Sequence, residues 1–221
     1  MSQNTLLYAT SNPGKILEMR SILEHLGFEV LSPEDLGCET DVQETGTNLG
    51  QNAEIKVRAY ARALLGHPAL VGKRVFILSD DTGFFIKALG GAPGIFVRRW
   101  RDGETRMGDE EIISYAIAQM ITLTGEDRTI QARTVLAMTI LNEDGTIVEP
   151  VMFEGSLDGH VLEQPDQMRI EGFPFASLMF VDSWGLLMGI GEQFPPHEKE
   201  DKLNHREQAV VKAVEYLRAL G

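Results

Sequence analysis

The pattern of apolar and polar residues predicts alternating strands and helices in the first third of the chain. Leu6–Thr10 is a short apolar run typical of a buried strand, and Asn12 with Pro13 is a favourable start for a helix. Apolar residues then recur at helical spacing as far as Gly27, which suits the end of a helix because glycine tolerates positive φ. Phe28–Leu31 is predicted as the next strand.

The remaining elements follow from the same periodicities. Helices are predicted at about 48–65, 109–123 and 204–220, and strands at 75–79, 129–141 and 147–153. Asp144-Gly145 predicts a hairpin turn between the last two strands. Early strand–helix alternation followed by a hairpin predicts an α/β fold with helices packed on a mixed sheet. We expect a single domain, residues 1–221, with two lobes and the second lobe at roughly 128–183.

Composition limits the partners and the location. The 221 residues carry 33 acidic and 20 basic side chains, a formal net charge of −13, so most of the surface repels nucleic-acid backbones and anionic membranes. No apolar run approaches the roughly 18 residues of a membrane span, Met1–Thr5 lacks a signal-peptide pattern, and Cys38 alone forms no intramolecular disulfide. We expect a cytoplasmic protein with no nucleic-acid or membrane partner. A polyanionic substrate would then require a local basic pocket and a divalent cation.

The turn from Thr10 to Lys15 is the first candidate site. A strand leads into a polar turn that opens a helix, so backbone N–H groups and the positive end of the helix dipole converge. Ser11 and Asn12 add hydrogen-bond donors and Lys15 adds a positive charge, a combination that suits a phosphate. The spacing is not that of a Walker loop. A capped helix with a solvated lysine is the alternative interpretation.

Acidic residues provide the second candidate. Asp80 and Asp81 follow the apolar run 75–79, and two carboxylates there are costly unless they are solvated, hydrogen-bonded or bound to a cation. Mg²⁺ binds one or two carboxylates together with substrate phosphates, and Glu44 would complete the ligand set. A strand cap and a turn aspartate are the alternative.

The third candidate lies at the start of the last helix. His205 and Arg206 stand in its first turn, where the helix dipole disfavours positive charge, so a compensating acceptor or anion is expected. Neutral histidine and arginine both donate hydrogen bonds, which suits recognition of a carbonyl on a base. Phe173, between glycine and proline, is a candidate for stacking on that base. The alternatives are a surface dipeptide and a core phenylalanine.

Taken in order, these segments resemble the inosine-triphosphate pyrophosphatase family, which removes nonstandard purine nucleotides. The resemblance covers nearly the whole chain and rests on Ala9-Thr10-Ser11-Asn12-Pro13-Gly14-Lys15, Glu44-Thr45-Gly46 with Asn52 and Lys56, Asp80-Asp81-Thr82-Gly83, and Asn204-His205-Arg206. Each block alone is weak, but four in the family's order are specific. The resemblance implies a two-lobed fold with an elongated mixed β-sheet flanked by helices, a deep cleft between the lobes, and a homodimer.

The resemblance also implies an activity and roles for individual residues. Such an enzyme cleaves a purine nucleoside triphosphate between the α- and β-phosphates, giving the monophosphate and pyrophosphate. By position, Asp81 is the general base, and Asp81, Glu44 and Asp80 are Mg²⁺ ligands. Lys15 contributes to catalysis by positioning the triphosphate and stabilising its negative charge. The residues that hold the triphosphate are Thr10, Ser11, Asn12, Pro13, Gly14, Lys15 and Lys56.

Base recognition is implied for a second group of residues. Phe173 stacks on the base, while His205 and Arg206 donate to a purine 6-keto group. Adenine is rejected because its 6-amino group leaves those donors unpaired. Thr82 keeps the hydroxyl of the family's serine and belongs to the substrate site.

The chain departs from the family pattern near the base. Pro174, Phe175 and Ala176, which we also assign to the substrate site, replace a glycine, a tyrosine and an aspartate. A lysine expected at Glu200 is absent, and Lys199 and Lys202 are its possible substitutes. These changes leave the metal and phosphate residues intact and bear on base recognition.

Three functions compete at this point. The first is Mg²⁺-dependent hydrolysis of ITP, dITP or XTP, which sanitises the nucleotide pool. The second is a nucleoside-triphosphate pyrophosphatase with an altered base preference, suggested by Pro174 and Ala176. The third is a nonenzymatic nucleotide-binding relative, against which the retention of Glu44, Asp81 and Lys15 argues.

Overall fold

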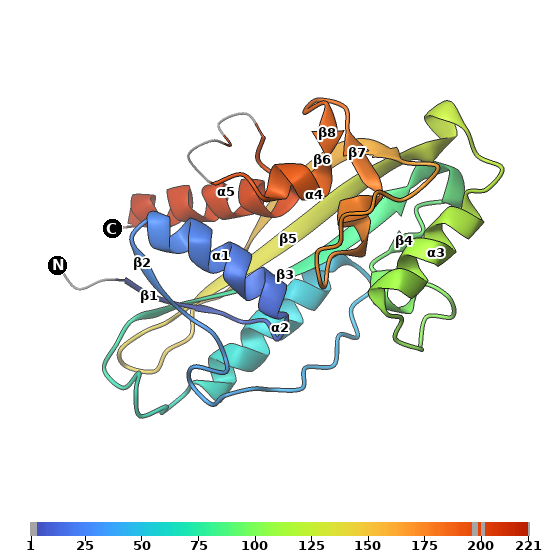
Figure 1. Cartoon of the computed structure of the whole chain (residues 1–221). Helices are drawn as coiled ribbons and strands as arrows, with labels where there is room; N and C mark the ends of the chain where they lie inside the picture. Colours follow the sequence, from blue (N-terminus) through green and yellow to red (C-terminus); the bar gives the residue numbers. More distant parts are fainter. Residues whose placement is uncertain (1–3, 196–198, 200–201, 221) are drawn as a thin grey trace. The chain divides into compact units, whose positions relative to one another are not determined.

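The computed structural model describes residues 4–195, 199 and 202–220. Strands and helices alternate in the first third of the chain, as predicted (Figure 1). The helices are α1 (Pro13–His25), α2 (Leu49–Ala63), α3 (Asp109–Gln119), α4 (Met188–Glu192) and α5 (His205–Leu220). The strands are β1 (Asn4–Tyr8), β2 (Phe28–Leu31), β3 (Val75–Ile86), β4 (Pro93–Gly94), β5 (Thr129–Leu141), β6 (Val151–Val161), β7 (Met179–Val181) and β8 (Leu186–Leu187). Short 3₁₀ helices are η1 (Lys87–Leu89), η2 (Val97–Arg99), η3 (Gly125–Arg128) and η4 (Pro174–Ser177).

The strands form one mixed sheet. Its order is β2-β1-β3-β5-β6-β7-β8, and β4 pairs with β3. β1 runs parallel to β2 and β3, whereas β4 is antiparallel to β3 and β7 is antiparallel to β6 and β8. The predicted α/β class with a mixed sheet is therefore confirmed. Along the described residues, none of the helices combines the length and the apolar character that a membrane crossing requires.

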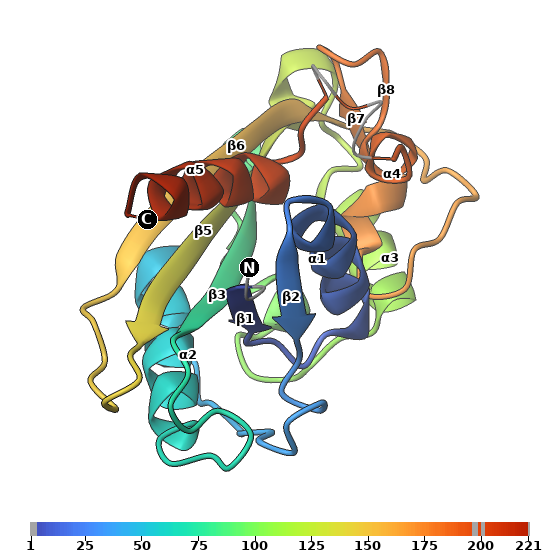
Figure 2. The same cartoon turned by 90° about the vertical axis from the view of Figure 1, so that its left-hand side faces the viewer.

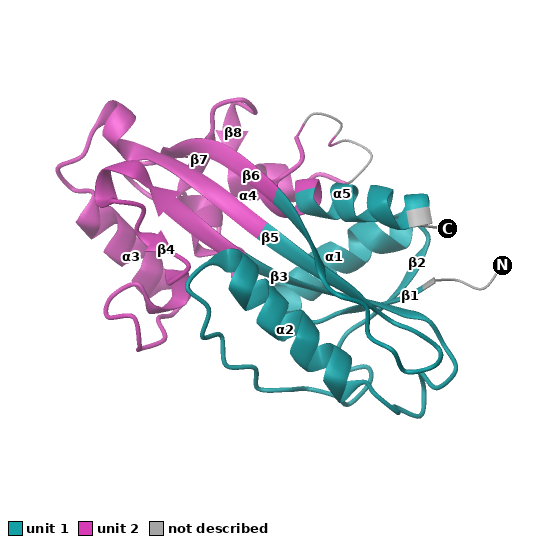
Figure 3. Ribbon diagram, turned by 180° about the vertical axis from the view of Figure 1, so that it is seen from behind, with its two compact units in different colours: residues 1–81, 135–154, 209–221 teal, residues 82–134, 155–208 magenta. Residues whose placement is uncertain are grey.

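The chain divides into two compact units, which Figure 3 distinguishes by colour. Unit 1 comprises 1–81, 135–154 and 209–221, and unit 2 comprises 82–134 and 155–208. The lobe that we expected at 128–183 overlaps unit 2 only in part. The divisions fall inside β3, β5, β6 and α5, so no linker between elements marks them in the sequence.

In unit 1, helices cover both faces of the strands. α1 and α5 lie on one face and α2 on the other (Figure 2). The core under α1 and α5 includes Leu6 and Leu78 from the strands and Met19 and Val210 from the helices. On the opposite face of β3, Ser79 Oγ donates to a backbone carbonyl of α2 at 2.7 Å. Successive residues of β3 therefore face different helices, as the pleat of a strand requires.

Unit 2 has its own apolar core. Residues of α3, η4 and the strands β3, β5 and β6 contribute to it. The rings of Phe84 and Phe175 stack there with centroids 4.2 Å apart. Arg128 is buried at its edge and donates to four backbone carbonyls, those of Met120, Leu123, Val161 and Leu162.

The predicted end of the strand at 75–79 was wrong, and the error changes where two acidic site residues lie. The strand expected at 75–79 continues to Ile86, so Asp80 and Asp81 lie within β3 rather than after it. The two acids interrupt the apolar pattern, which made them look like the end of the strand. β1 stops at Tyr8 opposite Leu78, and β3 extends beyond it toward its pairing with β4.

Two further boundaries also differ from the prediction. The strand expected at 147–153 begins at Val151 and runs to Val161, and the segment after the turn at Gly145 pairs with β5 through an isolated bridge between Ile147 and Leu141. The helix expected at 109–123 ends at Gln119.

Candidate functional site

The ammonium group of Lys56 on α2 lies close to two carboxylates in unit 1, those of Glu44 and Asp81. Its Nζ lies 3.5 Å from Glu44 Oε1 and 3.5 Å from Asp81 Oδ1. It also donates to the backbone carbonyl of Asp80 at 2.6 Å. The carboxylates of Glu44 and Asp81, distant in sequence, thus lie close to each other, because an oxygen of each is 3.5 Å from the same ammonium nitrogen.

Burial and charge shape the protonation of this cluster. Burial raises the pKa of the Asp81 carboxyl; the Lys56 ammonium opposes this, and the Glu44 carboxylate adds to the rise. Burial by itself lowers the pKa of Lys56, but the negative charges of Asp81, Glu44 and Asp80 outweigh it, so that pKa is raised overall. Lys56 therefore stays charged at neutral pH, and Asp81 holds a proton more readily than an exposed aspartate.

Asn52 connects the loop of Glu44 to Asp81. Its Oδ1 accepts from the backbone N–H of Gly46 at 2.8 Å, and its Nδ2 donates to Asp81 Oδ2 at 3.1 Å. A Cβ at Gly46 would lie 2.6 Å from Asn52 Oδ1, so only glycine permits this approach. Asn52 was not among the predicted site residues. Its place in the motif block with Glu44 and Lys56, and its position four residues before Lys56 on the same face of α2, are the signals that could have identified it.

Asp80 lies on the opposite face of β3. Its buried carboxylate accepts from the hydroxyl of Tyr8, and its Oδ2 lies 2.7 Å from Lys15 Nζ. Successive side chains of a strand alternate between faces, so Asp80 does not join Glu44 and Asp81. Over the ranges that the structure describes, no group of three or more His, Cys, Asp or Glu side chains is arranged to hold a metal ion. The structure brings together two of the three predicted ligands.

The turn before α1 is a helix cap. Asn12 Oδ1 accepts from the backbone N–H groups of Gly14 at 3.0 Å and Lys15 at 3.4 Å, and the Asn12 N–H donates to Thr10 Oγ1 at 3.2 Å. We expected these N–H groups to be open to a phosphate, but the cap already occupies two of them. The exposed residues of the turn are Ser11 and Pro13.

The residues expected to recognise the base lie in unit 2. His205 and Arg206 are 1% exposed, at the start of α5. The guanidinium carbon of Arg206 lies 5.6 Å from the ring centroid of the half-buried Phe173, and Arg206 Nη2 donates to Thr82 Oγ1 at 3.4 Å. Thr134 Oγ1, which the sequence did not indicate, lies 2.6 Å from His205 Nδ1.

The three residues after Phe173 pack into the interior of unit 2. Pro174, Phe175 and Ala176 are buried in η4, and the ring of Phe175 packs on Phe84 in the core of unit 2. Their assignment to substrate binding stays a prediction.

A capping box positions the start of α5. Asn204 Oδ1 accepts from the backbone N–H of Glu207 at 2.8 Å, and Glu207 Oε2 accepts from that of Asn204 at 2.8 Å. Lys199 Nζ lies 2.5 Å from Glu207 Oε1 and is buried, so it is committed to this ion pair rather than to a substrate. Lys202 Nζ lies 5.4 Å from the ring centroid of Phe194, and Glu200 falls outside the described residues.

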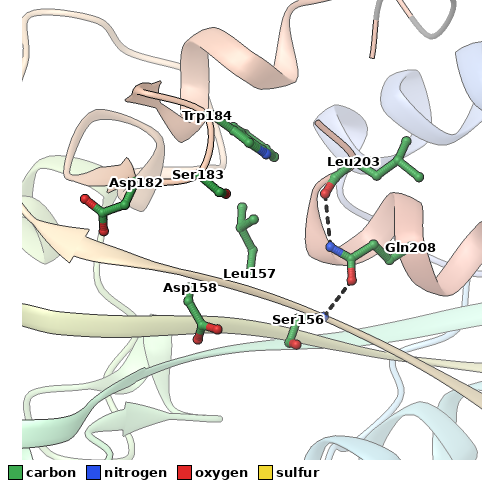
Figure 4. Close-up of a pocket in the computed structure, with 8 residues that line it drawn as sticks. All are labelled: Ser156, Leu157, Asp158, Asp182, Ser183, Trp184, Leu203 and Gln208. Atoms are coloured by element: carbon green, nitrogen blue, oxygen red, sulfur yellow. Dashed lines mark hydrogen bonds between the residues drawn. The ribbon is translucent and has the colours of Figure 1, made fainter. Parts of the chain in front are cut away.

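A separate hollow of about 440 Å³ lies in unit 2 (Figure 4). Gln208 lines one side of it, accepting from the backbone N–H of Ser156 at 3.3 Å and donating to the carbonyl of Leu203 at 3.0 Å. The two acids on its wall already have partners: Asp158 accepts from Gln131, and Asp182 pairs with His160. None of the site residues predicted from the sequence lines it. The lining residues are Ser156, Leu157, Asp158, Asp182, Ser183, Trp184, Leu203 and Gln208.

Comparison with known proteins adds a family and a fold. A model of the Ham1 family matches residues 6–216. A dITP/XTP pyrophosphatase of Symbiobacterium thermophilum is 33% identical over 100% of this chain and 98% of its own length. The dITP/XTP pyrophosphatase of Bacillus subtilis is 31% identical over 96% of each chain. The structure of the Staphylococcus aureus Ham1 protein is similar with a TM-score of 0.73 and 26% identity, covering 99% of this chain and 100% of that one.

Proposed function

This chain belongs to the Ham1 family, and we propose that it hydrolyses nonstandard purine nucleoside triphosphates such as dITP, ITP and XTP to the monophosphate and pyrophosphate. Relatives named for dITP and XTP hydrolysis, similar along nearly the whole chain, support this activity. The structural observation that carries it is the cluster in which Lys56 Nζ lies 3.5 Å from a carboxylate oxygen of both Glu44 and Asp81.

Glu44 and Asp81 are the residues that would hold a divalent cation, for which we propose Mg²⁺. Carboxylate oxygens are the ligands that Mg²⁺ prefers, and the ammonium of Lys56 at 3.5 Å from each indicates that the pair accommodates positive charge. When bound, Mg²⁺ would screen the phosphate charge and acidify a bound water. The raised pKa of Asp81 suits a carboxylate that takes a proton from the attacking water.

Positioned cations would bind the triphosphate. The Asp80 carboxylate holds Lys15 at 2.7 Å, and the Asp80 backbone carbonyl holds Lys56 at 2.6 Å, so both ammonium groups are oriented before a substrate arrives. Such preorganisation lowers the entropic cost of binding the substrate. In unit 2, His205 and Arg206 would donate to a 6-keto group, and Phe173 would offer its ring to the base.

A substrate panel tests the proposal. The protein is incubated with dITP, ITP, XTP, dGTP and dATP, and pyrophosphate and orthophosphate are measured separately, with Mg²⁺ or with EDTA. We expect pyrophosphate from dITP, ITP and XTP, little product from dATP and none with EDTA. Orthophosphate as the main product, or full activity with EDTA, would contradict the proposal. Equal turnover of dATP and dITP would favour an altered base preference, and binding without turnover would favour a nonenzymatic relative.

We also propose a cytoplasmic homodimer, on the resemblance to the family alone. Light scattering on the purified chain should then give twice its mass of 24.5 kDa. A monomer at micromolar concentration would contradict this.

A further inference from the structure

Thr134 of β5 connects the residues proposed to recognise the base through hydrogen bonds. Its Oγ1 lies 2.8 Å from Thr82 Oγ1 and 2.6 Å from His205 Nδ1. At the far end, Arg206 Nη2 donates to Thr82 Oγ1 at 3.4 Å. Thr134 is fully buried and His205 is 1% exposed, so bulk water does not compete for the bond between them.

Arg206 favours one direction for this chain of bonds. A guanidinium group only donates, so Thr82 Oγ1 accepts at that end. A hydroxyl that accepts a hydrogen bond becomes a stronger donor, and successive bonds reinforce each other when they run the same way. In that direction Thr82 donates to Thr134, and Thr134 donates to Nδ1 of His205. A neutral imidazole that accepts at Nδ1 carries its proton on Nε2.

We propose that Thr134 is a specificity-determining positioning residue that holds His205 in the Nε2–H tautomer. This rests on the proposed function, in which His205 donates to a 6-keto oxygen. The opposite tautomer would place a lone pair at Nε2, which repels a carbonyl oxygen and accepts from the 6-amino group of adenine. Thr134 would thus decide the preferred base without touching the substrate.

Nitrogen-15 NMR of histidine-labelled free protein tests the tautomer directly. The ring signals of His205 are assigned by their loss in His205→Gln. We expect a protonated Nε2 and an unprotonated Nδ1 in the wild type and in Thr134→Ser, which keeps the hydroxyl. In Thr134→Val, which keeps the shape and loses the hydroxyl, we expect a mixture of tautomers. A proton on Nδ1 in the wild type would overturn the proposal, even if the valine variant failed to fold.

Substrate selectivity tests the consequence. The ratio of kcat/KM for ITP to that for ATP should fall about tenfold to a hundredfold in Thr134→Val, the scale of one lost buried hydrogen bond, and return to near the wild-type ratio in Thr134→Ser. Thr139→Val is the matched control, because Thr139 is also buried on β5 but donates to the backbone carbonyl of Val148 in unit 1. Its ratio should not change.

Two results would overturn the role of Thr134. One is an unchanged selectivity ratio in Thr134→Val, and the other is an unchanged Nε2–H tautomer in that variant. Failure of the wild type to release pyrophosphate from ITP would contradict the proposed function instead, and the NMR spectra of the free protein would still decide whether Thr134 sets the tautomer.

Discussion

Asp80 and Asp81 are neighbours in sequence but pair with different lysines on opposite faces of β3. Asp80 Oδ2 lies 2.7 Å from Lys15 Nζ, whereas Asp81 Oδ1 lies 3.5 Å from Lys56 Nζ. The alternation of side chains along a strand makes this separation unavoidable. One pair of adjacent acids therefore serves two separate environments, with Asp80 fixing a cation and Asp81 facing Glu44.

Substitution of the two acids should have different kinetic effects. Asp81→Asn removes the proposed base, and we expect the turnover of dITP to fall by about 10²- to 10⁴-fold while nucleotide binding remains measurable. Asp80→Asn releases Lys15, so it should mainly raise KM. Steady-state kinetics and calorimetric nucleotide binding measure both effects. Similar losses of turnover in the two variants, with KM unchanged, would show that the division of roles is wrong.

The pH dependence of stability should report the burial of Asp81. Burial raises its pKa in the folded chain above the ordinary value of 3.8, so the folded state binds this proton more tightly than the unfolded state. The corresponding stability is fully present below pH 3.8 and is lost as pH rises through the folded pKa. In metal-free buffer, the unfolding free energy of the wild type should therefore fall relative to that of Asp81→Asn over this window and then level off. Chemical denaturation at a series of pH values measures the difference, and parallel curves would contradict the raised pKa.

Loss of Asn52 should weaken metal binding. Asn52→Ala removes the bonds to Gly46 and Asp81, so the loop that carries Glu44 is no longer held against β3. We expect the Mg²⁺ concentration for half-maximal activity to rise about 10- to 100-fold, as for other groups that orient metal ligands. Gln51→Ala is the control, because the Gln51 side chain accepts from the backbone N–H and the hydroxyl of Thr47 in the same loop. Equal effects in both variants would mean that general loosening of the loop, rather than the Asn52 bridge, is responsible.

Arg128 should be a stability determinant of unit 2. Arg128→Leu leaves four buried or partly buried carbonyls without this donor, so the unfolding free energy should fall by roughly 3 kcal/mol or more. Arg106→Leu, at an exposed position, should change it by less than about 0.5 kcal/mol. Urea denaturation measures both changes. A loss below about 1 kcal/mol for Arg128→Leu would show that the carbonyls find other donors.

Local signals in the sequence were sufficient for the elements and for the family resemblance. Asn12 caps α1, and Asn204 with Glu207 forms the capping box of α5, because each of these contacts lies within one helical turn. Each motif block likewise depends on short spacings within one segment. The order of the blocks along the chain then indicated the family before any contact was known.

Only the tertiary structure decided which distant groups meet. The bond from Asn52 to Asp81 spans 29 residues and that from Thr134 to His205 spans 71. Such pairs depend on which strands and helices pack together, and periodicity within one segment does not contain that information. The separation of Asp80 from Asp81 is a further example. The two side chains point to opposite faces because β3 continues through both residues, and the apolar pattern of the sequence did not show this. The sequence by itself determined the residues available for phosphate, metal and base, and the packing of the sheet and helices determined how they are paired.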